Sequence, residues 1–135
     1  MKYAAVVAVC LLMMSCKDPA PAEIPPLEIY PLQVDFQAGL GNDTVIVRID
    51  GAIVSAARHT TDSTLGRADS ISLNMLVGRH AIIVLGPELK SKIDTTFEQQ
   101  RARTYVGIGY NRTRQQWLFR YSLQPFVYGP ITDVL

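Results

Sequence analysis

Residues 43–56 read DTVIVRIDGAIVSA, and this stretch decides the fold class. Its first half is rich in β-branched residues that repeat with period two, which is typical of a β-strand. Asp50-Gly51 then separates two apolar runs. A type I′ turn needs positive φ at both central residues, and Asp-Gly is among the pairs that satisfy this most easily. The stretch therefore predicts a β-hairpin.

Further runs with strand character follow along the chain. Two late strands flank a polar turn at residues 111–114, and Tyr105, Trp117, Phe119 and Tyr121 at odd positions predict cross-strand aromatic contacts there. About seven short strands with no convincing helical period predict an all-β, antiparallel β-sandwich of the immunoglobulin or transthyretin type. The further strands are expected at residues 71–77, 80–85, 93–99, 105–110 and 117–122, with Gly78 turning the chain back between the first two and residues 59–69 as a loop or edge strand.

The run VIVRIDGAIV and the later LNMLVGRHAIIVL resemble PEGA-like and carboxypeptidase-regulatory-like β-sandwich modules. The matching pieces are Asp50-Gly51 and Gly78-Arg79-His80, within about forty residues in two stretches. The Pro-Glu-Gly-Ala motif itself is absent. The resemblance implies a non-catalytic module that serves as a spacer, a folding appendage or a platform for partners.

The N-terminus has the features of an export signal. Met1-Lys2 is a short positive region, and residues 3–14 form an apolar run of about a dozen residues. A membrane-spanning helix needs about 20 apolar residues, so this run is short for a span.

Residues 12–16, LMMSC, resemble the lipobox of bacterial lipoproteins, with small Ser15 before Cys16 and Met13 in place of the usual leucine. The resemblance implies cleavage after Ser15 and lipidation of Cys16, whose acyl chains would hold the protein on a membrane. The alternative is ordinary signal cleavage after the A-x-A sequence at residues 20–22, which would release a soluble protein without Cys16.

Five prolines between residues 17 and 31 predict an extended spacer, because proline fixes φ and lacks the backbone N–H. The expected organisation is a removed signal at 1–15, a lipidated linker at 16–31 and a β-sandwich domain at 32–135. We expect export to the envelope of a Gram-negative bacterium, with the outer membrane as the favoured address.

Composition argues against several classes of function. The chain has 13 basic and 12 acidic residues, and loss of Lys2 with the signal would leave the two equal, which gives no electrostatic reason to bind nucleic acid. Cys16 would be the only thiol after processing, so no intramolecular disulfide and no Cys-based zinc site is expected. No metal and no cofactor are predicted.

Catalytic signals are weak. His59 and His80 are the only histidines, and His80 follows a turn, where a hydrogen-bonded structural role is common. No G-x-S-x-G motif is present. Gly107-Ile108-Gly109 lies on a predicted strand, which favours close packing against neighbouring aromatic rings and not phosphate binding. The chain is therefore expected not to be an enzyme, although the two histidines meeting in one pocket would be an enzymatic alternative.

Arginines gather in the last third of the chain and form the candidate binding residues. Arg112 and Arg114 are expected at the tip of the last hairpin, with Arg101 and Arg103 at its base. They would bind an anionic partner, or simply form a solvated edge that resists aggregation.

The leading hypothesis is a non-enzymatic, lipid-anchored accessory that binds a partner or plays a structural role at the cell envelope. The alternative is a carbohydrate-binding or glycan-uptake accessory with Tyr105, Trp117 and Tyr121 as a stacking platform. The expected partners are the membrane, through the lipid, and an envelope protein or glycan. Exposure of the three rings distinguishes a platform from a core. The oligomeric state is left open by the sequence.

Overall fold

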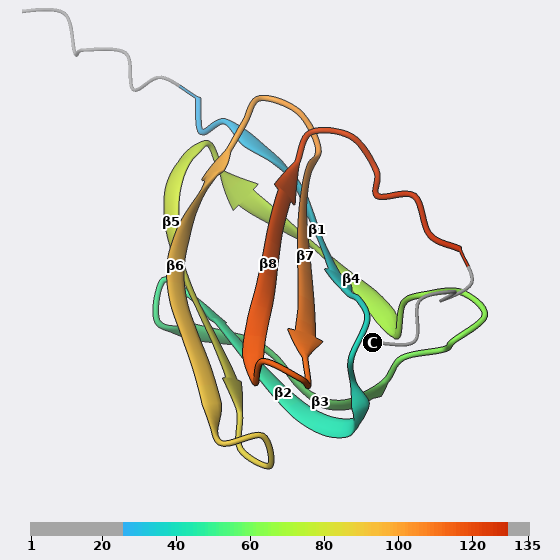
Figure 1. Cartoon of the computed structure of the whole chain (residues 1–135). Coiled ribbons are helices and arrows are strands. Elements are labelled where there is room, and N and C mark those ends of the chain that lie inside the picture. The colour runs from blue at the N-terminus through green and yellow to red at the C-terminus, as the bar shows by residue number, and fades with distance from the viewer. Residues whose placement is uncertain (1–25, 130–135) are drawn as a thin grey trace, which may run out of the picture.

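The computed structural model describes residues 26–129, which form a β-sandwich of two four-stranded sheets (Figure 1). This confirms the predicted fold class. The described part contains no helix long and apolar enough to cross a bilayer. The strands are β1 (Ile29–Phe36), β2 (Gly41–Ile49), β3 (Ala52–Thr60), β4 (Asp69–Leu76), β5 (Gly78–Gly86), β6 (Ser91–Gln99), β7 (Thr104–Asn111) and β8 (Gln116–Ser122).

The first sheet has the strand order β4-β1-β7-β8 and the second has the order β3-β2-β5-β6. Neighbouring strands are antiparallel except β1 and β7, which are parallel. The core lies between the sheets, where alternate residues of the central strands are fully buried. It includes Leu32, Val34, Phe36, Val45, Val47, Ile82, Val84, Val106 and Ile108.

The hairpin predicted from residues 43–56 is present as β2 and β3. Asp50 and Gly51 have φ values of 51° and 83°, as a type I′ turn requires. The pairing changes from Val47 with Ser55 to Arg48 with Ile53, so β3 carries a bulge close to the turn.

The second expected hairpin, at residues 71–77 and 80–85, is wrong in its pairing. Both strands exist, but β4 pairs with β1 and β5 pairs with β2 and β6. Gly78, with φ of 126°, therefore lies where the chain passes from one sheet to the other. Local sequence cannot distinguish a hairpin turn from such a crossing, because both need a short flexible connection.

β1 was not predicted, and it includes the last proline of the expected spacer. Pro31 lies opposite Asn74 of β4, whereas pairing with β7 begins only at Leu32. The missing N–H of Pro31 therefore removes no hydrogen bond from the ladder between β1 and β7. The strand begins at Ile29, so the expected spacer up to residue 31 is too long by three residues.

The last hairpin is confirmed, with a different aromatic contact from the one expected. Tyr110 pairs with Trp117, and their rings meet edge to face with centroids 5.2 Å apart. Tyr110 lies opposite Trp117, so the even-numbered residues of β7 share a face of the sheet with Trp117. Tyr105 is odd-numbered and therefore points to the other face.

Candidate functional site

The outer face of the first sheet carries an unusual set of buried polar residues. On β1, Leu32, Val34 and Phe36 point into the core, so the alternate residues point outward. Nevertheless Asp35 is only 1% exposed, and Gln37, just after the strand, is 6% exposed. They are buried because the chain after β8 runs back over this face (Figure 1). We call residues 123–129 the C-terminal segment.

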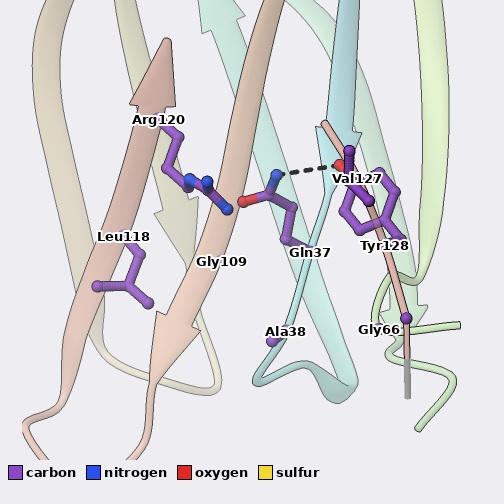
Figure 2. A pocket seen from close by; sticks show the side chains of 9 residues that line it. Gln37, Ala38, Gly66, Gly109, Leu118, Arg120, Val127 and Tyr128 are labelled. Atoms are coloured by element: carbon purple, nitrogen blue, oxygen red, sulfur yellow. Dashed lines mark hydrogen bonds between the residues drawn. The ribbon is translucent and has the colours of Figure 1, made fainter. Parts of the chain in front are cut away.

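Tyr128 of the C-terminal segment is held by a chain of hydrogen bonds. Its hydroxyl donates to Oδ2 of Asp35 at 2.5 Å and accepts from Nε2 of Gln37 at 3.0 Å. Figure 2 shows the Gln37 contact, with Arg120 reaching from β8 toward Gln37. Gln33 donates to the other carboxylate oxygen of Asp35 at 2.8 Å. Asp35 of β1 and Gln37 just after it thus fasten the C-terminal segment to the sheet, and Gln33 holds Asp35 in place.

The ionisation of Tyr128 suits this role. Burial of the ring, followed by the hydrogen bond to Asp35, raises the pKa of Tyr128 to about 12. The hydroxyl therefore remains protonated at physiological pH and continues to donate to the carboxylate. Tyr128 acts here as a structural donor, since a phenol with this pKa does not serve as a base near neutrality.

The two glycines of β7 make room for this arrangement. A side chain at Gly107 would overlap the side chain of Gln37, and one at Gly109 would press on the backbone of Ala38. The close packing predicted for Gly107-Ile108-Gly109 is therefore confirmed, although its partners are Gln37 and Ala38 and not aromatic rings.

Two hollows flank Tyr128, and together we call them the Tyr128 groove. The larger, of about 510 Å³, is lined by Gln33, Asp35, Thr64, Leu65, Arg67 and Phe126, among others. The smaller, of about 250 Å³, lies toward β8 and includes Gln37, Leu118 and Arg120 (Figure 2). The Arg67 guanidinium lies 5.5 Å from the centre of the Tyr128 ring. A carboxylate, amides, guanidinium groups and aromatic rings thus converge on one surface.

The two histidines do not share a pocket. His59 stacks on Phe36 at 3.9 Å between ring centres, and it lies on β3 opposite Asp43 at the start of β2. His80 contacts Asp50, just after the end of β2. Seven residues of extended strand separate Asp43 from Asp50, or about 24 Å. The enzymatic alternative in which both histidines meet is therefore wrong.

His80 has the hydrogen-bonded role expected from its position. Its Nδ1 lies 2.5 Å from the Asp50 carboxylate, and its Nε2 lies 2.6 Å from the carbonyl oxygen of Leu76. Burial lowers the pKa of His80, but the bonds to Asp50 and Leu76 outweigh burial and leave the pKa raised. Asp50 and His80 belong to the two pieces quoted above for the resemblance to PEGA-like modules, and they are in direct contact.

The four predicted arginines lie at opposite ends of the last hairpin, as expected, and do not form one site. Arg112 and Arg114 lie in the β7–β8 turn, while Arg101 and Arg103 precede β7. Arg112 forms an ion pair with the largely buried Asp43.

At the other end, Arg101 forms an ion pair with Glu28 at 2.8 Å. Two of the four arginines thus have carboxylate partners within the chain, which reduces the charge left for an anionic partner. Cys16, the predicted lipidation site, lies outside the described residues.

The predicted stacking platform is not assembled. Tyr105 and Trp117 are 9% and 8% exposed, with Tyr105 packed against Phe126 and Trp117 against Tyr110. Only Tyr121 presents a ring to solvent, at 41% exposed. Because their rings are buried, Tyr105 and Trp117 contribute to packing and do not form a sugar-stacking surface.

No family model matches this chain, and no curated protein matches it. The Tyr128 groove was missed by sequence analysis. Its one local signal is the alternation at residues 32–37, LQVDFQ, where polar residues regularly separate buried apolar ones. That pattern equally describes an ordinary solvated strand face, because nothing in it reveals that residues 90 positions later fold back over it.

Proposed function

We propose that this protein is a lipid-anchored, non-enzymatic accessory of the bacterial cell envelope that presents a β-sandwich for partner binding or structural support. The observation that carries the proposal is Cys16 in a lipobox-like sequence, followed by a proline-rich spacer that leads into the first strand. Residues 17–28 would hold the domain up to about 37 Å from the lipid surface, at about 3.1 Å per residue.

A binding role is supported by the chemistry of the Tyr128 groove. Its polar groups are hydrogen-bonded to one another, and the hydroxyl of the half-buried Tyr128 is kept protonated. Such a surface of hydrogen-bonding groups and rings favours recognition over proton transfer. Among the described residues, no group of three or more histidine, cysteine, aspartate or glutamate side chains gathers as a metal site would.

Metabolic labelling with palmitate tests the anchor. The wild-type chain should incorporate label and its mature form should begin at Cys16, while Cys16→Ser should remain unlabelled. Cys10→Ser is the matched control, because that thiol lies inside the predicted signal and its loss should leave labelling unchanged. An unlabelled wild type whose mature chain begins at Glu23 would show instead that cleavage follows the A-x-A sequence.

Glycan binding is the second candidate, and the lining of the Tyr128 groove favours it. Sugars are recognised by hydrogen-bonding side chains together with rings that contact their apolar faces, and the larger hollow combines Gln33, Thr64 and Arg67 with Phe126.

A panel of envelope oligosaccharides tests this candidate on the full chain. A positive glycan should lose about tenfold or more in affinity on Arg67→Ala, as expected for loss of a charged hydrogen bond. Tyr121→Ala is the control, because its exposed ring lies outside the groove. Binding lost in Tyr121→Ala but kept in Arg67→Ala would place the sugar elsewhere.

A further inference from the structure

β4 (Asp69–Leu76) is an edge strand that lacks the usual protection against further pairing. It forms a regular ladder with β1, from Ile29 opposite Leu76 to Phe36 opposite Asp69. No strand among the described residues pairs with its other edge. From residue 70 to residue 76 it has no charge and no proline. Natural edge strands are generally blunted by charge, proline or a bulge, because free backbone groups can pair with another chain.

The other three edges are protected. β3 carries its bulge and the charged Arg58, which forms an ion pair with Glu88 at 3.5 Å. β6 alternates outward Lys92, Asp94 and Glu98. β8 carries Arg120, and Tyr121 closes that side of the sandwich by donating to the carbonyl oxygen of Glu98 at 2.8 Å. Among the edges of the described sheets, protection is therefore missing on β4 alone.

The core also remains open at β4. Ile71, Leu73 and Met75 pack against the buried core, but each is only half-buried. They form one row with period two along the inner side of the strand. A strand added beside β4 would cover this row with its own inward side chains and would fill the free row of backbone groups.

We propose that β4 pairs with β4 of a second copy of this chain, antiparallel about a two-fold axis at Leu73. This register places Leu73 opposite its counterpart, Ile71 opposite Met75 and Ser72 opposite Asn74. Apolar residues meet on the inner side, and on the outer side Ser72 meets Asn74 while the exposed Leu76 meets Ser70. The strand is therefore largely complementary to itself. Two four-stranded sheets would become one continuous eight-stranded sheet with an isologous interface.

The charges agree with self-pairing. Asp69 is the only charged residue on β4, and it lies at the start of the strand. The two-fold arrangement places each Asp69 opposite Val77 of the other copy. The two aspartates then stand eight residues apart along the strand, or about 27 Å, which exceeds the screening length at physiological salt. No like charges are brought together.

Native mass spectrometry of the full processed chain in detergent tests the proposal. The wild type should be a dimer. The double variant S72K/N74K should be monomeric, with dimer affinity reduced about tenfold or more, because the lysine introduced at position 72 would face the lysine introduced at position 74 of the other copy. Ser72 and Asn74 are on the outer face and Asn74 is exposed, so the fold should persist, as circular dichroism would show.

A charge-swapped variant, S72K/N74E, provides the decisive control. In the proposed register each lysine faces a glutamate, so the dimer should return. A monomeric wild type would overturn the proposal, as would a dimer that S72K/N74K leaves intact or that S72K/N74E fails to restore. A dimer formed only after removal of residues 130–135 would also overturn it, because the edge would then belong to this chain's own C-terminus.

Discussion

His80 connects two turns that are distant in sequence. Both of its ring nitrogens face acceptors, the Asp50 carboxylate and the Leu76 carbonyl oxygen, so both contacts are satisfied as hydrogen bonds only by the protonated ring. The same contact with His80 lowers the pKa of Asp50, although burial of the carboxylate opposes this. The β2–β3 turn is thereby fastened to the connection between the sheets.

This contact predicts a pH dependence of stability. Because the pKa of His80 is raised in the folded state, its contribution is present below the ordinary value of 6.5 and is lost as pH rises through the folded pKa. The Asp50 side of the contact is lost progressively as pH falls below the ordinary value of 3.8 and through the lowered pKa of Asp50 in the fold. His80→Gln should therefore remove about 1 kcal/mol of unfolding free energy at pH 6, and less at pH 9, in urea titrations.

His59 provides the matched control, because its effect has the opposite sign. Burial lowers the pKa of His59, although the charge of Asp69 opposes this. Protonation of His59 therefore destabilises the fold as pH falls below 6.5. The His80→Gln variant should lose unfolding free energy as pH falls below 6.5, because only the His59 effect remains. The His59→Gln variant should instead keep the stabilisation that protonated His80 provides in acid. Identical pH profiles for the two variants would contradict the assigned roles.

Two glycines with positive φ should differ sharply when changed to alanine. Gly39 has φ of 89°, and a side chain there would overlap the carbonyl oxygen of Tyr110. Gly51 has φ of 83° with open space around it. Gly39→Ala should lower the unfolding free energy by about 3 kcal/mol and Gly51→Ala by about 1 kcal/mol, measured by chemical denaturation. Equal losses would show that backbone conformation alone is responsible.

At the scale of elements, the C-terminal segment is fastened to β1 mainly through one hydroxyl group. Tyr128→Phe would leave Oδ2 of the buried Asp35 and Nε2 of Gln37 without this partner. We expect a loss of about 2 kcal/mol in unfolding free energy, together with faster proteolysis near residues 123–129.

Tyr121→Phe is the matched control for that prediction. It also removes a hydrogen-bonded hydroxyl, but from a partly exposed ring. Its expected loss is about 0.5 kcal/mol. Losses of similar size in the two variants would argue against a special role for the Tyr128 contact.

Strands that pair with a neighbour in the sequence were predictable, whereas strands that pair with distant residues were harder to predict. The β2–β3 and β7–β8 hairpins follow from period-two patterns and from the turn residues between them. β1 was missed because Pro31 conceals its start, and its pairing with β7 depends on residues about 70 positions away. The Tyr128 groove was missed for the same reason, since Asp35 and Tyr128 meet only after the whole sheet has formed.

For the whole molecule, the position of β1 fixes where the folded unit begins. β1 is an interior strand with neighbours on both sides, and Leu32, Val34 and Phe36 are completely buried. A chain that begins at residue 26 should unfold cooperatively on heating, while one that begins at residue 37 should not fold. Circular dichroism melting curves would check this, and a cooperative transition in the shorter chain would show that the second sheet is stable alone.

The parallel pairing of β1 with β7 joins two strands that lie far apart in the chain, with Leu32 opposite Thr104 and Phe36 opposite Ile108. β4 precedes β7 in the chain and can pair with β1 earlier, but β1 has neighbours on both sides only when residues 104–111 have joined it. This pairing closes a loop of about 70 residues, and the entropy of closing it must be overcome before the contact stabilises the chain. We therefore expect slow refolding, as is usual for β-sandwiches dominated by contacts between residues distant in sequence.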